Sequence, residues 1–369
     1  MRKTIVTSRY MLIDMPGRLL RNMLVLGIIL LAGCSRHERS RYMLPKFPEV
    51  EEKNFEILTG PLMYTMSSAI QESGPYLVVM AADADLQAYC HIYDKQGSLL
   101  GYTFHRGRAR GEIVGLVGDL FVSGESVTYV DRIKKASLTF DIEDFLSNDN
   151  GAVEEYAVLL SRWEDSRRIA KDYEVSYAKI SPVAQTGDEV INRITVLDQN
   201  ENVVATNNTY PEEDGWKNWA DTYHLSASPD GSKLAIVPSW SGTMELFDLP
   251  DLQRRYTGYF APQEFESTNG GVGFTDKTAL MFTDVCATDT RVYAAWGGDV
   301  ALQPNERLPE SERAIPVNKI DIFDWNGKPL RRIVTDYRID HMCVDSEERN
   351  IYAILRDPED SYYIGRVSL

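Results

Sequence analysis

Short runs of alternating apolar and polar residues, separated by turn residues, cover the chain from about residue 54 to its end. The segment His91-Ile92-Tyr93-Asp94-Lys95-Gln96-Gly97 is typical, because an alternating run ends at an aspartate and a glycine follows closely. Alternation with a period of two indicates half-buried β-strands, and clustered Asp, Asn and Gly indicate tight turns. Long helical periodicity is almost absent. The pattern therefore predicts an all-β domain.

An apolar residue followed by aspartate ends a strand-like run at five places along the chain. These pairs are Tyr93-Asp94, Phe140-Asp141, Leu197-Asp198, Phe247-Asp248 and Phe323-Asp324. A second recurring element, two strands joined by a turn, has copies at Leu225–Val237, Val285–Ala295 and Met342–Ala353. Repeats of roughly 50 residues are typical of propellers and other repeat folds. Together the two elements predict a four-stranded antiparallel blade.

Six such blades account for the repeat. We expect them at residues 68–105, 114–160, 170–210, 222–262, 280–335 and 338–369. The last blade ends after its third strand, whereas Asn54–Gly60 is a strand-like segment that no blade uses. A propeller protects its edge strands when one terminus completes the blade of the other. The sequence thus predicts a six-bladed β-propeller over residues 52–369, closed by the N-terminal strand, in preference to a β-sandwich.

The first 33 residues predict an export signal followed by a lipid attachment site. Basic residues precede a short apolar run, Met23–Leu30, which is too short to span a bilayer. Leu31-Ala32-Gly33-Cys34 then resembles the lipobox of bacterial lipoproteins, in which the cysteine is lipidated and becomes the mature N-terminus. An ordinary signal peptide is the alternative, and Met11 or Met15 is an alternative start. The charged, aperiodic residues 34–51 are predicted to be a flexible tether.

A lipid anchor predicts a membrane-tethered domain in the cell envelope. Acyl chains contribute about 0.8 kcal/mol per buried CH₂, so two or three chains hold such a protein stably. Ser35 stands where an aspartate is typical of lipoproteins kept in the inner membrane, which favours the outer membrane. The basic residues Arg36, Arg39 and Arg41 follow, whereas surface-export tethers tend to be acidic. We therefore expect the domain to face the periplasm.

Two motifs of the repeat resemble those of a known family. Ser228-Pro-Asp-Gly-Ser-Lys-Leu-Ala235 is similar to the repeats of TolB-like propellers, and Arg108-Ala-Arg-Gly-Glu112 resembles the Gly-x-Gly-Pro-Gly-Glu loop of bacterial TolB-like six-bladed lipoproteins. The second motif lacks the proline, and Asn200-Glu201 replaces an expected Asn-Gly turn. The resemblance covers nearly the whole mature chain. It implies architecture and location more than an activity.

The charge and the cysteine count narrow the classes of partner and fold. Removing residues 1–33, which hold five basic residues and one acidic residue, changes the net charge from −16 to −20. Such an acidic surface repels phosphate backbones, so no nucleic-acid partner is expected. Beyond Cys34 only Cys90, Cys286 and Cys343 occur, which excludes a disulfide framework. Three buried thiols are the favoured interpretation, and a Cys286–Cys343 bridge is the alternative.

The sequence identifies no catalytic centre, metal site or cofactor. The five histidines, His37, His91, His105, His224 and His341, occur without a nucleophile elbow or a metal-binding spacing. Asp198-Gln-Asn-Glu-Asn202 alternates oxygen ligands as a calcium loop does, but it lacks the glycine and the closing glutamate. A hairpin turn is the favoured interpretation of that segment. A triad assembled from distant residues is still compatible with the sequence.

Three connectors between predicted blades combine arginine with aromatic residues. Their candidate ligand-binding residues are Arg106, Arg108, Arg110, Trp163, Arg167, Arg168, Trp216 and Trp219. Guanidinium groups bind carboxylate or phosphate through two parallel hydrogen bonds, and tryptophan offers a flat apolar surface. The hypothesis is a face that binds an anionic glycan, peptide or protein loop. The alternative is that the arginines pair with neighbouring acids and the tryptophans fill gaps between blades.

Two functional hypotheses follow. The first is a lipid-anchored, non-catalytic, monomeric binding module for a protein or carbohydrate partner, without a cofactor. The second is a polysaccharide hydrolase or lyase with its site at the central channel, where Asp284, His341 and Asp345 flank predicted inner strands. For these three residues, structural positions in turns and at strand ends are the favoured interpretation. Converging titratable groups in the channel would favour the second hypothesis, and a channel filled with apolar side chains would exclude it.

Overall fold

The structure is a computed structural model in which Tyr42–Leu369 forms one compact unit. It describes residues 43–148, 153–157, 166–170, 173–177, 194–198, 200, 202–207, 223–261, 265–268, 271–275, 278–298 and 317–369. The predicted signal peptide and the lipidation site Cys34 lie outside these residues. Within them, no helix is both long enough and apolar enough to cross a membrane.

The described residues form six sheets of four or five strands and one two-stranded ribbon. The first sheet contains β3 (Tyr64–Ser73), β4 (Tyr76–Asp83), β5 (Ala88–Asp94) and β6 (Leu99–His105). The second contains β7 (Gly118–Ser123), β8 (Ser126–Asp131), β9 (Ala136–Asp141) and β10 (Glu154–Ala157). The third contains β11 (Ser166–Ala170), β12 (Tyr173–Tyr177), β13 (Ile194–Asp198) and β14 (Val203–Asn207).

The remaining sheets follow the same order of strands along the chain. The fourth contains β15 (Tyr223–Ala227), β16 (Lys233–Pro238), β17 (Gly242–Asp248) and β18 (Gln253–Ala261). The fifth contains β21 (Phe282–Ala287), β22 (Arg291–Trp296), β23 (Lys319–Asp324) and β24 (Pro329–Val334), and the sixth contains β25 (Arg338–Val344), β26 (Asn350–Arg356) and β27 (Tyr362–Ser368). The ribbon of β19 (Phe265–Thr268) and β20 (Gly271–Phe274) comes between the fourth and fifth sheets.

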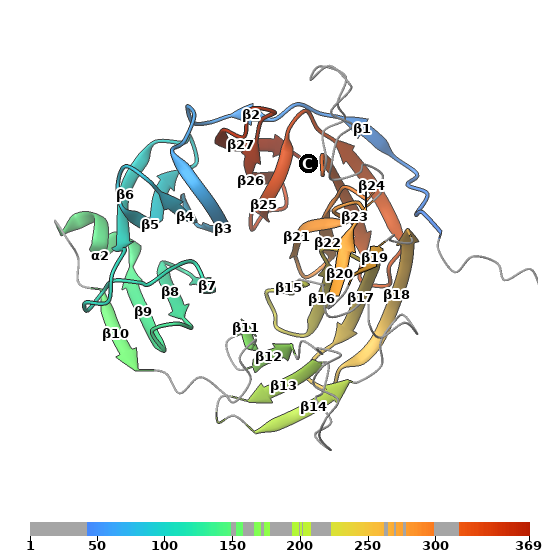
Figure 1. Cartoon of the computed structure of the whole chain (residues 1–369), viewed down its shortest axis with the longest axis horizontal. Helices are drawn as coiled ribbons and strands as arrows, with labels where there is room; N and C mark the ends of the chain where they lie inside the picture. The colour runs from blue at the N-terminus through green and yellow to red at the C-terminus, as the bar shows by residue number, and fades with distance from the viewer. Residues whose placement is uncertain are drawn as a thin grey trace, which may run out of the picture. The chain divides into compact units, whose positions relative to one another are not determined.

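Within each of the six sheets, consecutive strands pair antiparallel, and Figure 1 shows the sheets arranged around a common centre. The first strand of each sheet, such as β3, β15 or β25, lies nearest that centre, and the last lies at the rim. This arrangement is a β-propeller. Central strands such as β16 (Lys233–Pro238) are almost continuously buried because both faces of each sheet are covered by neighbours.

The N-terminal segment adds strands to the last two sheets. Strand β1 (Val50–Glu52) pairs parallel with β24, and β2 (Glu56–Ile57) pairs antiparallel with β27. Ahead of β1, the Phe47 ring packs edge-on against Phe323, with 5.4 Å between ring centroids. The sequence assigned residues up to 51 to a flexible tether, and the structure corrects this boundary. The correction arises because main-chain pairing and a single aromatic anchor leave no periodic signal in so charged a segment.

The repeated strand-ending aspartates cap the outer hairpins of their sheets. Asp94, Asp198 and Asp324 each accept backbone N–H groups from the residues two and four positions later, at 2.8–2.9 Å. Gly97 and Gly327 adopt positive φ angles of 88° and 76° in two of these turns. The side chain thus replaces the missing ladder partners of the turn, which is the function that the sequence pattern predicts.

Two copies of the aspartate repeat are used differently. Asp141 is the N-cap of α2 (Ile142–Ser147) and accepts a hydrogen bond from the Asp144 amide. The sequence did not predict this helix, because it is too short to show a helical period. Asp248 forms an ion pair with Arg255 on the next strand, β18. One sequence motif therefore serves three local structures.

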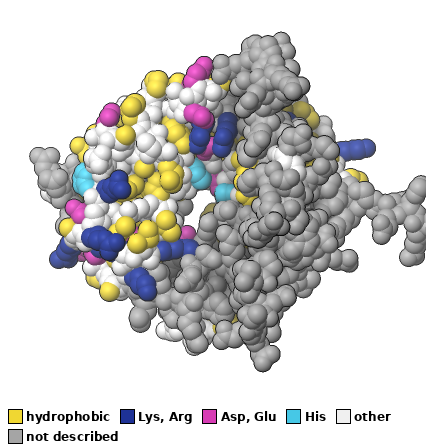
Figure 2. All heavy atoms as spheres, viewed as in Figure 1, with side chains coloured by type: hydrophobic (Ala, Val, Ile, Leu, Met, Phe, Trp, Pro, Cys, Tyr) yellow, Lys and Arg dark blue, Asp and Glu magenta, His cyan; other side chains and the backbone are white. Residues whose placement is uncertain are grey.

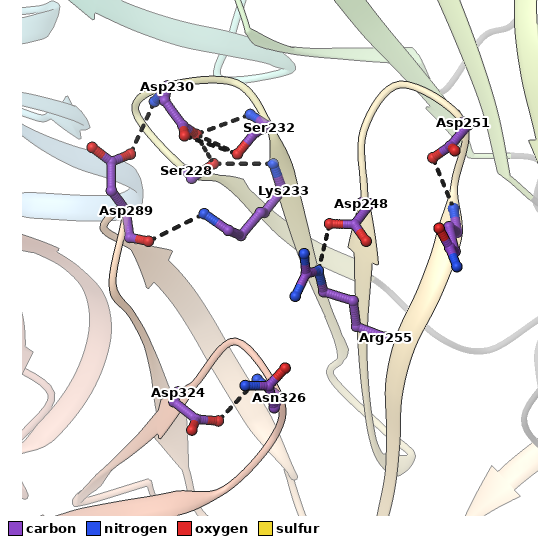
Figure 3. A network of polar contacts seen from close by, with 11 residues as sticks. Ser228, Asp230, Ser232, Lys233, Asp248, Asp251, Arg255, Asp289, Asp324 and Asn326 are labelled. Atoms are coloured by element: carbon purple, nitrogen blue, oxygen red, sulfur yellow. Dashed lines mark hydrogen bonds and ion pairs between the residues drawn. The ribbon is translucent and has the colours of Figure 1, made fainter.

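The Ser228–Lys233 turn shows how neighbouring sheets are joined. The Asp230 carboxylate accepts hydrogen bonds from the Ser228 hydroxyl and the Ser232 amide, and these contacts lower its pKa to about 2. The Asp230 amide donates to the Asp289 carboxylate at 3.0 Å, and Lys233 Nζ donates to the Asp289 carbonyl at 3.2 Å (Figure 3). The TolB-like motif of the sequence therefore connects the fourth and fifth sheets.

The three cysteines of the folded domain are free thiols, as the favoured interpretation of the sequence predicts. Cys90 and Cys343 are buried, and Cys286 is half-buried. Burial raises the pKa of all three thiols, which keeps them protonated at neutral pH. Strands β13 and β14, on either side of Asp198 and Asn202, pair antiparallel as a hairpin would, and hydrogen bonds from Asn202 and Asn200 lower the pKa of Asp198.

Candidate functional site

The first arginine-rich connector is a short, tightly closed loop between β6 and β7. The Ile113 amide donates to the His105 carbonyl at 3.0 Å, and the Gly107 amide donates back to the Ile113 carbonyl at 2.9 Å. Gly107 leaves room for the Glu112 side chain, because a Cβ at position 107 would lie 1.8 Å from the Glu112 carboxylate and would displace it. Gly111 has a φ of 78°, which favours glycine. The glycines and the glutamate of the family-like motif therefore determine the path of the loop.

Two partly buried charged side chains of the second sheet, Lys134 and Glu155, hold the tip of this loop. Lys134 Nζ donates to the carbonyls of Ala109 and Glu112 and to the carboxylate of Glu155, at 2.6, 3.0 and 2.7 Å. The same Glu155 carboxylate accepts the Gly111 amide at 2.7 Å. Burial opposes ionisation of Glu155, but Lys134 and the Gly111 amide together lower its pKa. The main chain of the loop is thus satisfied without using any arginine.

Arg106, Arg108 and Arg110 are all exposed. Within the described residues, the structure gives none of the three an ion pair or a side-chain hydrogen bond. The sequence left open whether these arginines bind a ligand or pair with neighbouring acids. Two acids of this region have other partners: Glu112 accepts the Ala109 amide at 2.8 Å, and Glu155 binds Lys134, while Arg110 contributes to the lowered pKa of Glu155 only through its charge.

Two exposed tyrosines lie near this loop, one on β6 and one on β10. Tyr102 is 40% exposed and its ring lies 5.9 Å from that of His105, edge to face. Tyr156, at the outer strand β10, is 58% exposed and lies close enough to Arg110 for the guanidinium to lower the pKa of the phenol, against the larger effect of Glu154, which raises it. Figure 2 shows Lys and Arg side chains beside hydrophobic ones over this part of the ring. We call Arg106, Arg108, Arg110, Tyr102 and Tyr156 the arginine surface.

The other two predicted connectors are only partly placed. Arg167 and Arg168 lie in β11, of which the structure describes the backbone alone, and they pair with Val175 and Glu174 of β12. Trp163, Trp216 and Trp219 lie outside the described residues. Of the predicted connector residues, those whose side chains the structure describes, Arg106, Arg108 and Arg110, all come from the first connector.

A second group of functional side chains meets where the inner strands begin. Asp284 on β21 lies between His341 on β25 and His224 on β15. Its carboxylate oxygens are 3.6 Å from His341 Nδ1 and 4.0 Å from His224 Nδ1. Each of the three side chains is between 17% and 19% exposed. Figure 2 shows histidine side chains bordering the hollow at the centre of this face, with acidic and basic side chains beside them.

Asp284 and His341 form a charged pair. Burial raises the pKa of Asp284, but His341, His224 and the Met342 amide outweigh burial and lower it below its ordinary value of 3.8. Burial lowers the pKa of His341, but Asp284 and Asp340 outweigh burial and raise it above 6.5. The Asp284 carboxylate also accepts the Met342 and Val285 amides, both at 2.9 Å. Each side chain thus favours the charged form of the other.

Sequence reasoning identified part of this centre and missed the rest. It proposed Asp284, His341 and Asp345, and the structure brings the first two together. Asp345 is a turn residue whose carboxylate accepts the Arg349 and Asn350 amides at 2.7 and 3.1 Å, as the favoured interpretation of the sequence predicts for this residue. His224 was interpreted as a structural histidine, yet it contacts both Asp284 and, through Nε2, the Ser239 hydroxyl at 2.9 Å.

Other titratable clusters lie deeper in the sheets. His91 is fully buried in the first sheet with its ring 5.2 Å from that of Tyr64, and burial lowers its pKa to about 4. Among the residues that the structure describes, no three or more His, Cys, Asp and Glu side chains are arranged to hold a metal ion.

Comparison with solved structures shows the fold. A protein described as exported, from Bacteroides fragilis NCTC 9343, superimposes with a TM-score of 0.50 at 11% identity, over 87% of this chain and 99% of that chain. U3-55K gives a TM-score of 0.47 at 9% identity, over 86% and 98% of the two chains. KlHsv2 with loop 6CD replaced by a Gly-Ser linker gives 0.36 at 9% identity, over 82% and 84%.

The family of this chain is assigned from the match of its sequence to a family model. No curated protein matches this chain. The model of the family described as TolB-like 6-blade propeller-like matches residues 63–347, which include the arginine surface from Tyr102 to Tyr156 and the centre formed by His224, Asp284 and His341. The match agrees with the β-propeller seen in the structure and with the resemblance carried by the Ser228 turn. The chain therefore belongs to the TolB-like 6-blade propeller-like family.

Proposed function

We propose that this protein is a binding module of the cell envelope whose arginine surface binds an acidic glycan. The observation that carries the proposal is that Arg106, Arg108 and Arg110 are exposed and form no ion pair or side-chain hydrogen bond with the described residues, on a loop that other groups hold in place. Guanidinium groups recognise carboxylates through paired hydrogen bonds, and exposed tyrosine rings provide flat surfaces for sugar rings. A preformed loop loses little conformational freedom when it binds.

The same proposal includes a closed, six-bladed ring. The six larger sheets would be the six blades, and β2 would complete the last of them. Supporting this, β2 pairs with β27 through Glu56–Arg366 and Ile57–Gly365, and Phe55 is buried in the core formed by the fifth and sixth sheets. Pairing at the rim covers an edge strand and leaves both faces of the ring accessible.

We further propose that the domain is held at the membrane by a lipid on Cys34 and faces the periplasm. The lipobox-like residues 31–34 support this, as does the basic segment after the cysteine. Protease treatment of intact cells tests the orientation: the domain is expected to survive until the outer membrane is permeabilised. Rapid loss from intact cells would place it outside.

Retention on immobilised polysaccharides tests the binding function. The full-length chain, purified in detergent, is applied to polygalacturonate, which carries a carboxylate on every sugar, and to neutral dextran. We expect retention on polygalacturonate alone, with elution by salt because the contacts are ionic. Equal retention on both matrices, or on neither, would contradict an acidic-glycan function.

The channel centre supplies the observation that favours the second hypothesis of the sequence. Asp284 and two histidines converge from three sheets, and titratable groups that converge in a channel are characteristic of catalytic sites. The binding function proposed above does not depend on this centre.

A further inference from the structure

Ser239, His224 and Asp284 lie in the order of a nucleophile, its base and the carboxylate that orients the base. Ser239 Oγ is 2.9 Å from His224 Nε2, a hydrogen-bond distance. The opposite ring nitrogen, Nδ1, faces the Asp284 carboxylate at 4.0 Å. A serine, a histidine and an aspartate in this relation form the site of many acyl-transfer enzymes with unrelated folds. The chain order here is His, Ser, Asp, so no short sequence motif could reveal the group.

Three elements hold the group together. Ser239 directly follows β16, and its carbonyl accepts the Met281 amide at 2.8 Å, which ties it to the segment entering β21. His224 is the second residue of the inner strand β15, and Asp284 lies on the neighbouring inner strand β21. The arrangement depends on the packing of the fourth sheet against the fifth and not on a flexible loop.

A second histidine, His341, also contacts the Asp284 carboxylate. His341 lies against the other carboxylate oxygen at 3.6 Å, and the Met342 amide donates to that same oxygen. These contacts keep the carboxylate ionised while one oxygen stays directed at His224. The 4.0 Å separation from His224 exceeds a hydrogen bond, and catalytic contacts are often long before substrate binds.

We infer that Ser239, His224 and Asp284 form a nucleophilic site that hydrolyses carboxylic esters. Ser239 is the nucleophile, His224 is the general base and then the general acid, and Asp284 is a positioning residue. Esters are the expected class, because an alcohol leaves readily once a single proton is delivered to it.

The proposed hydrolysis consumes only the ester and one water molecule. Ser239 Oγ attacks the ester carbonyl carbon while His224 Nε2 takes the hydroxyl proton, which gives a tetrahedral intermediate. The bond from carbon to the alcohol oxygen then breaks, and His224 returns the proton to that oxygen. Water attacks the acyl-serine with His224 again as the base, which releases the carboxylic acid and restores Ser239. Asp284 orients the ring and stabilises its charged form throughout.

A fluorophosphonate probe tests the inference directly, because it forms a covalent bond only with an activated serine. The full-length chain, purified in detergent, is treated with the probe, digested and analysed by mass spectrometry. We expect a single adduct on the peptide that contains Ser239, and turnover of p-nitrophenyl acetate by the same preparation. No adduct, or an adduct on another serine, would overturn the inference whether or not any variant folds.

Variants then separate the roles. Ser239→Ala is expected to abolish labelling, and His224→Gln to lower p-nitrophenyl acetate turnover by about 10²–10⁴-fold. Asp284→Asn should lower kcat with little change in KM and shift the pH profile of the remaining activity, which a purely structural role would not do. The matched control is Ser241→Ala, two residues away and also buried, whose hydroxyl contacts Thr243 at 3.0 Å.

Equal loss in Ser239→Ala and Ser241→Ala would indicate damage to the segment and contradict the assignment. Each variant is compared with the parent by thermal unfolding, so that loss of fold is recognised. The arginine surface is unchanged in all of these variants, and their retention on polygalacturonate should equal that of the parent. Failure of the esterase test therefore leaves the proposed binding function standing, and the reverse holds too.

Discussion

The arginines of the sheets and the arginines of the 105–112 loop differ in one respect. Arg332 on β24 lies opposite Asp321 on β23 and binds both carboxylate oxygens at 2.6 and 2.7 Å. Arg356 on β26 donates two hydrogen bonds to one carboxylate oxygen of the buried Asp340 on β25, at 2.8 and 3.1 Å. Arg106 and its two neighbours, by contrast, have no such partner among the described residues.

The arginines of the sheets stabilise the fold, whereas those of the 105–112 loop are available to bind a ligand. A strand places an arginine beside the acid of the adjacent strand, and a buried carboxylate such as Asp321 needs that partner. In the loop, Lys134 occupies the acceptors that an arginine would otherwise use. The arginines of the loop are therefore free of a structural task, which the arginines of the sheets are not.

The largest effect is expected from breaking a sheet pair. Arg332→Ala removes the two-point contact from the fully buried Asp321 and should lower the free energy of unfolding by about 3 kcal/mol. Urea unfolding measures it. Arg366→Ala is the matched control, since its partner Glu56 is 61% exposed, and it should cost less than about 1 kcal/mol. Similar losses in both variants would contradict the distinction between buried and exposed pairs.

Loss of the anchor of the loop should have an intermediate effect. Glu155→Ala removes the acceptor of Lys134 and of the Gly111 amide and should cost about 1–2 kcal/mol. Faster hydrogen exchange at the amides of residues 107–112 is the specific readout. Unchanged exchange there would show that the loop does not depend on Glu155.

The pair of Asp284 and His341 should make the free energy of unfolding depend on pH. The lowered pKa of Asp284 contributes stability above its ordinary value of 3.8, which is lost as the pH falls through the lower pKa of the folded state. The raised pKa of His341 contributes stability below 6.5, which is lost as the pH rises through the higher pKa of the folded state. Stability measured against pH should therefore decline above 6.5 in the parent and less so in His341→Gln. Identical slopes would exclude the pair as a source.

The smallest effect on stability is expected in the loop arginines. Replacing Arg106, Arg108 and Arg110 together with alanine should change the free energy of unfolding by less than about 0.5 kcal/mol, because exposed side chains without a partner contribute little. A loss comparable to that of Arg332→Ala would show that these arginines are structural after all.

The repeat made the propeller predictable, because each strand and turn leaves its own local pattern. The aspartates at positions 94, 198 and 324 signal their turns directly, since a side chain that caps the following amides acts within four residues. Helix α2 and strand β1 were missed because one is too short for a helical period and the other is held by contacts to β24.

The two candidate sites also differ in how far the sequence alone could reveal them. Arg106, Arg108 and Arg110 could be grouped from the sequence because they lie within five residues on one loop, and their role in binding a ligand stays a prediction. The group of Ser239, His224 and Asp284 could not be recognised, because its members meet only after two sheets pack together. Asp345 carried the same residue type near the same strand, yet its own turn uses the carboxylate, and no local pattern distinguishes the two aspartates.

Calorimetric titration with polygalacturonate tests whether the arginine surface is the ligand site. The triple variant Arg106→Ala, Arg108→Ala and Arg110→Ala is compared with the parent and with a control triple that removes the same charge elsewhere, at the exposed residues Arg255, Lys328 and Arg349. We expect the loop triple to weaken binding by at least about tenfold, a loss of about 1.4 kcal/mol, and the control triple to bind as the parent does. Equal affinities for the two triples would contradict the claim that the arginine surface is the ligand site.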